Sequence, residues 1–196
     1  MKIAVTGGIA TGKSTVCRLL ARLLKVCAMD ADQICHELME KGQPGWLGIR
    51  RAWGERFFDA EGAVDRTLLR KTVFVEEGIR HELEAILHPL VRTGIAARER
   101  ALAGENLLVE VPLIYEVGWQ SDFDRIVTVY ATESRCIQRI IARDRTTVQD
   151  ARRILAAQMP VVCKALQADS VIDNSGPWAY TCLQTYDLAR FLRKTP

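Results

Sequence analysis

The sequence predicts an α/β fold in which a five-stranded parallel sheet is flanked by helices and interrupted by a helical insertion. Short apolar runs alternate with helical patterns, which is typical of a parallel sheet covered on both faces. Between about residues 33 and 104 apolar residues recur only with helical spacing, so this stretch is the predicted insertion. Strands are expected at residues 3–6, 26–29, 107–111, 126–130 and 170–172.

The first predicted strand runs directly into a phosphate-binding loop. Residues 7–14 read Gly-Gly-Ile-Ala-Thr-Gly-Lys-Ser and match the full G-x-x-x-x-G-K-[ST] pattern. A helical apolar pattern begins after Lys13. Strand, glycine-rich loop and helix in this order bind a nucleotide triphosphate, so we predict a P-loop NTPase core.

Each part of this loop has a physical task. The glycines at positions 7, 8 and 12 let successive amide N–H groups point at an anion, and the helix N-terminus adds partial positive charge. Lys13 can reach the outer phosphates, and the Ser14 hydroxyl suits a magnesium ion. The predicted nucleotide-binding residues of the loop are Gly8, Ala10, Thr11, Gly12, Lys13, Ser14 and Thr15.

The second predicted strand ends in two carboxylates, Asp30 and Asp32. Ligands of open parallel sheets collect outside the carboxyl ends of the strands, and alternation along an extended chain points both side chains to one side. One carboxylate can accept the proton of an attacking hydroxyl, while the other holds metal-bound water or orients the acceptor. The alternative is structural, because Asp is a favoured N-cap residue and Asp32 can cap the next helix.

The helix expected from about Glu133 to Asp144 carries an arginine stripe. Arg135, Arg139 and Arg143 recur every four residues along one face, opposite an apolar face. Guanidinium groups bind phosphate oxygens in pairs, so this stripe can close over a nucleotide as a lid. A solvated charged face is the alternative.

Composition indicates a cytoplasmic globular protein. The chain has 196 residues, of which 48% are hydrophobic and 26% charged, and its net charge of +3 is too small to indicate nucleic-acid binding. Six cysteines form no C-x-x-C pair, which favours reduced thiols, and no apolar run is long enough to cross a bilayer. We expect no membrane, nucleic-acid or obligate protein partner.

The chain resembles the dephospho-CoA kinase family nearly from end to end. The phosphate loop is common to many kinases, whereas the other segments, in this order and spacing, are much more specific. The resemblance rests on Thr6-Gly-Gly-Ile, Gly12-Lys-Ser-Thr15, Asp30-Ala-Asp32, Asp65-Arg66, Leu69-Arg70, Val73-Phe74, His88-Pro-Leu-Val91, Val111-Pro-Leu-Ile-Tyr-Glu116, Arg139, Arg143-Asp144, Ala157-Gln-Met-Pro160 and Val171-Ile-Asp-Asn-Ser-Gly176.

This resemblance implies ATP-dependent phosphorylation of the ribose 3′-hydroxyl of dephospho-CoA, giving coenzyme A and ADP, with Mg²⁺ as cofactor. It also implies a three-part build. The nucleotide-binding core comprises residues 1–33, 104–134 and 166–196, the helical acceptor domain residues 34–103, and the lid residues 135–165.

Family roles are carried over to matching positions. Asp32 is the implied general base, with Lys13, Arg139 and Arg143 as further catalytic residues, and Asp30 joins Ser14 at the metal. Arg143, Asn174 and Gly176 are expected at ATP, the last two framing adenine. The implied acceptor residues are Asp30, Asp32, Arg70, His88, Pro112, Tyr115 and Glu116.

Alternatives and departures accompany these roles. A nucleoside monophosphate kinase-like enzyme shares the loop, insertion and lid, and a non-catalytic nucleotide switch would bind ATP without acceptor-dependent ADP release. His88 precedes Pro89, which is expected to disrupt a helix, so a structural role at a domain hinge is the alternative for His88. Ala10-Thr11 replaces the commoner Gly-Ser, and Glu110 is expected to pair with a basic residue or to face the metal through water.

Overall fold

The computed structural model describes residues 1–102 and 104–194. The chain divides into two compact units. Unit 1 comprises Met1–Met29 and Gly104–Pro196, and unit 2 comprises Asp30–Ala103. The finer division into core, acceptor domain and lid stays a prediction.

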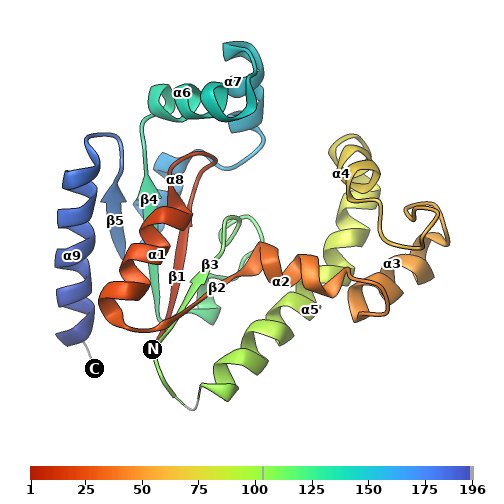
Figure 1. The fold of residues 1–196 in the computed structure, drawn as a ribbon, viewed down its shortest axis with the longest axis horizontal. Coiled ribbons are helices and arrows are strands. Elements are labelled where there is room, and N and C mark those ends of the chain that lie inside the picture. The colour runs from red at the N-terminus through yellow and green to blue at the C-terminus, as the bar shows by residue number, and fades with distance from the viewer. Residues whose placement is uncertain (103, 195–196) are drawn as a thin grey trace. The chain divides into compact units, whose positions relative to one another are not determined.

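Unit 1 is built on the predicted five-stranded sheet, with strand order β2-β3-β1-β4-β5 (Figure 1). β1 pairs in parallel with β3 on one side and with β4 on the other, and β4 pairs in parallel with β5. The strands are β1 Lys2–Gly7, β2 Cys27–Asp30, β3 Leu107–Glu110, β4 Arg125–Tyr130 and β5 Ser170–Asp173. The fold class predicted from the alternating apolar runs is therefore confirmed.

Helices cover both faces of this sheet, as Figure 1 shows. Alternation along β1 and β4 turns Ile3, Val5, Val127 and Val129 toward α1 and α9, where they form the main hydrophobic core. On the other face the Thr128 hydroxyl donates to the Lys164 carbonyl of α8. The unit 1 helices are α1 Lys13–Leu24, α6 Glu133–Asp144, α7 Val148–Ala156, α8 Val161–Gln167 and α9 Trp178–Lys194, with a short 3-10 turn at Gln120–Asp122.

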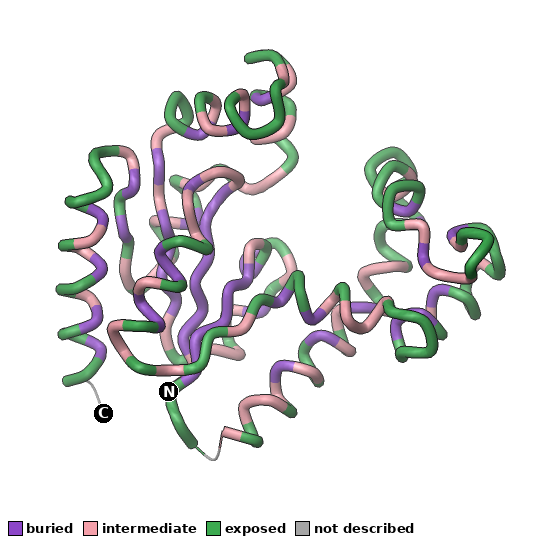
Figure 2. The backbone as a smooth tube through the Cα atoms, in the orientation of Figure 1, coloured by how far each residue is buried: buried purple, intermediate pink, exposed green. Residues whose placement is uncertain are grey.

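The central strands are buried on both sides, which explains their continuous apolar sequences. Every residue of β3 and residues 3–7 of β1 are buried (Figure 2). β2 is different, because it lies at the edge of the sheet and most of its residues are exposed. The phosphate loop therefore begins at the buried end of β1, where close packing leaves the backbone little freedom.

Unit 2 is helical, as the sequence predicts. Its helices are α2 Ala31–Leu38, α3 Pro44–Trp53, α4 Arg66–Val75 and α5 Glu77–Ala101. The long helix α5 packs against the other three, and the core comprises Trp46, Ile49, Phe57, Val64, Leu69 and Ile79. Among the described residues of this unit, β pairing is limited to one isolated bridge between Phe58 and Val64.

One local expectation for unit 2 is wrong. Pro89 lies inside α5, and the helix continues through it to Ala101 instead of ending near His88. Proline lacks an N–H group and so removes one helical hydrogen bond, but the packing of α5 against its three neighbours outweighs this loss. His88 is thus a mid-helix residue.

No helix in the described part of the chain combines the length and the apolar character that a membrane span requires.

Candidate nucleotide and acceptor sites

The phosphate loop joins β1 to α1 and is organised around the carbonyl oxygen of Gly8. This oxygen accepts hydrogen bonds from the Thr11 hydroxyl at 3.0 Å, from the Thr11 N–H at 3.4 Å and from the Lys13 ammonium at 3.2 Å. Gly12 is the N-cap of α1 and has a left-handed φ of 93°. The loop is thus a closed turn that places Lys13 at the first position of a helix, where positive partial charge and a cation attract the same anion.

Two glycines of the loop are required by sterics. A Cβ on Gly7 would lie 2.5 Å from the Val129 carbonyl oxygen, and a Cβ on Gly12 would lie 2.3 Å from Asn174 Nδ2. At Gly8 an added Cβ would make only ordinary contacts, at 3.5 Å, with Thr11 and Val161. The three glycines of the motif therefore have different tolerances that the pattern itself does not reveal.

Arg139 and Asn174 hold the outer side of the loop. Arg139 Nη1 donates to the carbonyls of Ala10 at 3.0 Å and Thr11 at 3.1 Å, and its Nη2 donates to the Asn174 carbonyl at 2.8 Å. Asn174 Nδ2 also donates to the Thr11 carbonyl at 2.8 Å, while its Oδ1 accepts from Thr181. Both residues were predicted near the nucleotide, and in the structure they contact the backbone of the loop that would bind it.

Ser14 has an acidic partner. Its hydroxyl donates to Oε1 of Glu110 at 2.8 Å, and Glu110 is buried at the end of β3. The expectation for Glu110 named a basic residue or a metal, whereas the structure pairs it with the predicted metal-binding hydroxyl. A hydroxyl and a carboxylate are hard oxygen donors of the kind that Mg²⁺ prefers, and Mg²⁺ commonly keeps several waters beside one or two protein ligands. The donor set therefore fits magnesium.

Of the two carboxylates around the end of β2, Asp30 caps the following helix, whereas the capping role had been considered for Asp32. Asp30 is the N-cap of α2, because its Oδ1 accepts from the backbone N–H groups of Asp32 at 2.9 Å and Gln33 at 3.4 Å. The capping alternative was considered for Asp32, but Asp32 lies in the exposed first turn of the helix. Its carboxylate is thus displayed on the surface of unit 2 at a helix N-terminus, where negative charge is favoured.

Unit 2 contains a cavity of about 860 Å³ that combines cations with apolar walls. Arg70, a predicted acceptor residue, contributes to its lining together with Arg66 and Lys71 on the same helix. The remaining lining is mostly apolar and includes Leu69, Val73, Phe74, Leu83 and Leu87. Arg66 was named only within the family segment Asp65-Arg66, and Lys71 was not named; the i, i+4 spacing of Arg66 and Arg70 on one helix is a usable signal, whereas nothing local marks Lys71.

His88 and Cys35 are titratable groups of unit 2. Burial lowers the pKa of His88, and the nearby Glu84 carboxylate opposes this shift. Burial raises the pKa of Cys35, which lines the cavity, to about 11, and the charge of Asp32 adds to the rise. Both groups are thus held in their neutral forms at neutral pH.

Three predicted acceptor residues follow β3 in unit 1 and are involved in internal contacts. The Pro112 carbonyl accepts from the Thr6 hydroxyl at 3.2 Å and from the Lys164 ammonium at 2.7 Å. Tyr115 is only 7% exposed, and Glu116 pairs with Lys164 at 2.7 Å. Lys164 is the partner that sequence analysis did not assign, because the two residues are 48 positions apart and no local pattern connects them.

The predicted arginine stripe lies on α6, whose bounds match the expected helix. Its three members have different partners: Arg139 binds the loop, Arg135 donates to the Ser175 carbonyl at 2.9 Å, and Arg143 pairs with Asp144 at 2.7 Å. The hydrogen bonds that Arg143 donates to the Asp144 carboxylate raise the pKa of Arg143, which therefore stays charged. Gly176 lies in the exposed turn before α9 and does not contact the loop through any described interaction.

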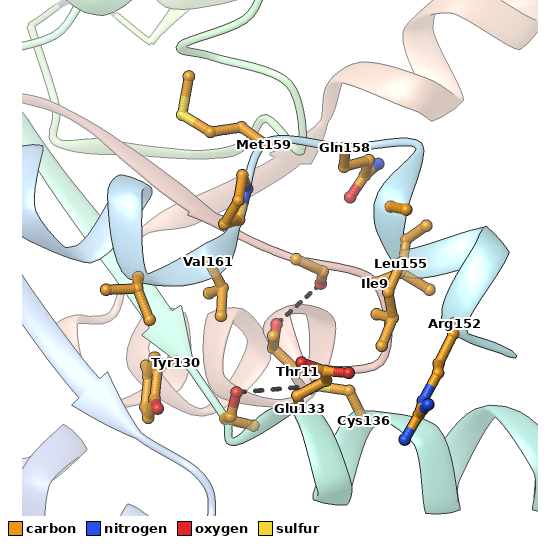
Figure 3. A pocket seen from close by; sticks show the side chains of 15 residues that line it. Ile9, Thr11, Tyr130, Glu133, Cys136, Arg152, Leu155, Gln158, Met159 and Val161 are labelled. Carbon is orange, nitrogen blue, oxygen red and sulfur yellow. Dashed lines mark hydrogen bonds between the residues drawn. The ribbon is translucent and has the colours of Figure 1, made fainter. Parts of the chain in front are cut away.

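A second cavity, of about 520 Å³, lies in unit 1 beside the phosphate loop (Figure 3). Ile9 and Thr11 of the loop line it together with Leu155, Gln158 and Met159, and Figure 3 shows Ile9 beside Leu155. Gln158 Oε1 is buried and has no hydrogen-bond partner among the described residues. The loop and the segment between α7 and α8 thus line the same cavity.

Comparison with known proteins agrees with these features. A family model described as dephospho-CoA kinase matches residues 1–179. Curated relatives named dephospho-CoA kinase include one from Desulfotalea psychrophila, 37% identical over 94% of each chain, and one from Thiobacillus denitrificans, 40% identical over 90% of this chain and 88% of the relative.

Solved structures also match this chain over nearly its whole length. A Thermus thermophilus protein matches with a TM-score of 0.84 at 27% identity, covering 100% of this chain and 98% of that one. A dephospho-CoA kinase from Campylobacter jejuni matches with a TM-score of 0.72 at 26% identity, covering 99% of this chain and 98% of that one. The match to the family model and the curated relatives, over almost the whole chain, settles the family: this chain belongs to the dephospho-CoA kinases.

Proposed function

We propose that the protein transfers the γ-phosphoryl group of ATP to the ribose 3′-hydroxyl of dephospho-CoA, giving coenzyme A and ADP. The observation that carries this proposal is the family match over residues 1–179, which spans both the phosphate loop of unit 1 and the cationic cavity of unit 2. The proposed reaction needs two small-molecule substrates and is a cytoplasmic one. It requires no nucleic acid, membrane or protein partner.

The donor half of the reaction belongs to the phosphate loop. Amide groups of the loop that are not engaged within it would bind the phosphates, and Lys13 would neutralise charge on the outer ones. Mg²⁺ would be held by Ser14 and, through water, by Glu110, with Asp30 as the further predicted contributor; it would neutralise charge on the transferring group. Phosphoryl transfer requires little covalent help, so positioning and charge neutralisation account for most of the catalysis.

The acceptor half belongs to unit 2. Dephospho-CoA carries a diphosphate and a long pantetheine arm in which methyl and methylene groups alternate with two amides. Arg66, Arg70 and Lys71 supply cations at the cavity, and Leu83 and Leu87 supply apolar surface. A pocket with a few charged groups among apolar walls is suited to such a mixed ligand. His88 is a further acceptor contact in this proposal, acting as a neutral hydrogen-bonding group.

Asp32 is the proposed general base. The helix-capping hydrogen bonds are accepted by Asp30, so capping does not require the Asp32 carboxylate. The carboxylate would accept the proton of the ribose hydroxyl as the new phosphorus–oxygen bond forms. Arg143 would exchange its contact with Asp144 for phosphate oxygens, while Arg139 keeps the loop in shape.

A coupled assay of ADP release tests this function. Purified protein with Mg-ATP is offered dephospho-CoA, AMP, CMP or shikimate, and we expect dephospho-CoA alone to accelerate ADP release. Acceleration by a nucleoside monophosphate instead would favour the related kinase class. ATP binding with no acceptor-dependent release would favour a nucleotide switch. Either result would refute the proposal.

Asp32→Asn tests the base. Removing a general base typically lowers kcat by about 10²–10⁴-fold. The substitution should leave the ATP-induced increase in Tm unchanged, because Asp32 does not belong to the phosphate loop. A kcat within about twofold of wild type would show that Asp32 does not act as a base.

A further inference from the structure

Lys164 in α8 is a fully buried lysine, with 0% of its side chain exposed. Its ammonium donates to the Pro112 carbonyl at 2.7 Å and lies 2.7 Å from Oε1 and 3.0 Å from Oε2 of Glu116. Lysine is almost never fully buried unless it is paired. Nothing in the proposed chemistry uses this cation, so its retention at this place requires a separate explanation.

The contacts of Lys164 join three segments that are distant in the sequence. The Pro112 carbonyl also accepts from Thr6, the buried residue directly before the first glycine of the phosphate loop. Glu116 Oε1 accepts from the backbone N–H of Met159 at 3.1 Å, in the connection between α7 and α8. The pair formed by the buried Lys164 and Glu116, whose side chain is 24% exposed, thus ties the end of β1, the segment after β3 and the α7–α8 connection together.

The α7–α8 connection also borders the phosphate loop and the cavity beside it. Val161 at the start of α8 lies next to Gly8 of the loop, 3.5 Å from the place a Gly8 Cβ would occupy. Gln158, one residue before Met159, lines the cavity of about 520 Å³ (Figure 3). Its side-chain amide oxygen, Oε1, is buried and lacks a hydrogen-bond partner among the described residues. The connection is therefore tied through the Met159 N–H to Glu116 on one side and borders the cavity along Gln158 and Met159 on the other.

We propose that Lys164 and Glu116 are positioning residues that form a fixed pivot for the predicted lid. They hold the Met159–Pro160 connection against the base of the phosphate loop, so that α6 and α7 approach bound ATP about one defined point. This inference rests on the proposed function. Stability alone is a poor explanation of the buried Lys164 ammonium, since replacing a buried charge and its partner by apolar residues of similar size often causes no loss of stability.

That property separates positioning from stability in an experiment. Removing Glu116 leaves the buried Lys164 ammonium unpaired and should lower Tm, whereas Lys164→Met with Glu116→Met removes both charges and should restore a Tm close to wild type. If the pair positions the lid, kcat of the double variant still falls by about tenfold or more, because small misplacements of catalytic groups are that costly. Its KM for ATP changes little, since the phosphate loop is intact.

A matched control removes another ion pair of unit 1. Arg125 and Asp169 lie 3.6 Å apart at the amino-terminal ends of β4 and β5, away from the loop. Arg125→Met with Asp169→Asn should leave kcat and both KM values near wild type.

Hydrogen exchange gives a readout that does not depend on turnover. A non-hydrolysable ATP analogue should protect the amides of α6 and α7 in the wild type and protect them less in the Lys164→Met, Glu116→Met variant. If the double variant keeps wild-type kcat and wild-type protection, the pair is only structural and the inference is wrong. If no variant, wild type included, phosphorylates dephospho-CoA, the proposed function fails, while the exchange result still decides the pivot.

Glu116 alone provides a second test that does not depend on the folding of the double variant. Glu116→Gln keeps an acceptor for the Met159 N–H, so its kcat should fall less than that of Glu116→Ala. Equal kcat values for these two variants would overturn the inference. So would an effect of Glu116 substitutions on KM for dephospho-CoA that Lys164→Met does not share, because it would assign Glu116 to the acceptor.

Discussion

Gly12→Ala is the substitution that tests most directly how the phosphate loop is built. Gly12 has a φ of 93°, which side chains other than glycine rarely adopt. The added methyl would lie 2.3 Å from Asn174 Nδ2, and Asn174 is only 6% exposed. Asn174 would have to move away from the Thr11 carbonyl and from Thr181.

The magnitude follows from three contributions. A left-handed backbone costs a residue with a Cβ about 1–2 kcal/mol. Leaving buried polar groups without partners costs about 1–3 kcal/mol. Replacing glycine also lowers the conformational entropy of the unfolded chain, which stabilises the folded state by about 0.5–1 kcal/mol. The free energy of unfolding should thus fall by about 1–4.5 kcal/mol, which for a chain of this size lowers Tm by roughly 2–18 °C.

Urea unfolding of Gly12→Ala beside Gly8→Ala checks this reasoning. Gly8 belongs to the same loop, but its added Cβ would make only ordinary contacts at 3.5 Å, so its loss should be below about 1 kcal/mol. Gly12→Ala should also show a smaller increase in Tm on adding ATP, because the Thr11 carbonyl and the amides next to it shift. Equal losses for the two variants would refute the steric argument.

Three further predictions concern single residues. Ala10 has a left-handed φ of 61°, so Ala10→Gly relieves about 1–2 kcal/mol of strain, while the greater freedom of glycine in the unfolded chain costs about 0.5–1 kcal/mol. Urea unfolding should show a variant that is up to about 1.5 kcal/mol more stable than wild type, and a loss of stability would contradict this. Ser14→Ala should raise the Mg²⁺ concentration for half-maximal ADP release by about tenfold, and an unchanged Mg²⁺ titration would exclude Ser14 from the metal. The pKa of Cys35 is raised from 9.0 to about 11, so the unfolded chain loses this proton first and stability falls as pH rises from about 9 to 11. Urea midpoints across that range should decline less for Cys35→Ala than for wild type.

The sheet and the main helices could be predicted because their signals are local. β1 and β3 are buried on both faces, so their apolar runs are continuous, and α6 has opposite charged and apolar faces. The phosphate loop carries its chemistry in eight consecutive residues. Local patterns of this kind do not depend on knowing which segments meet in space.

Contacts between distant segments could not be predicted in the same way. Ser14 and Glu110 are 96 residues apart, and the alternatives considered for Glu110 did not include a hydroxyl. The reversal at Asp30 and Asp32 has a smaller cause, because a shift of two residues in where α2 begins decides which carboxylate caps it. At Pro89, tertiary packing of α5 outweighed a strong local signal.

Hydrogen-bond donors from outside the motif prepare the phosphate loop for an anion. In each peptide unit the N–H and C=O groups point in opposite directions, so donors that bind the carbonyls on one side orient the amides to the other. Arg139 holds the carbonyls of Ala10 and Thr11, and Asn174 adds a second donor to Thr11. These donors come from α6 and from the end of β5, which means that residues remote from the motif fix the direction of its amides. The energy of ordering the loop is thus supplied during folding, and binding of the phosphates does not have to supply it again.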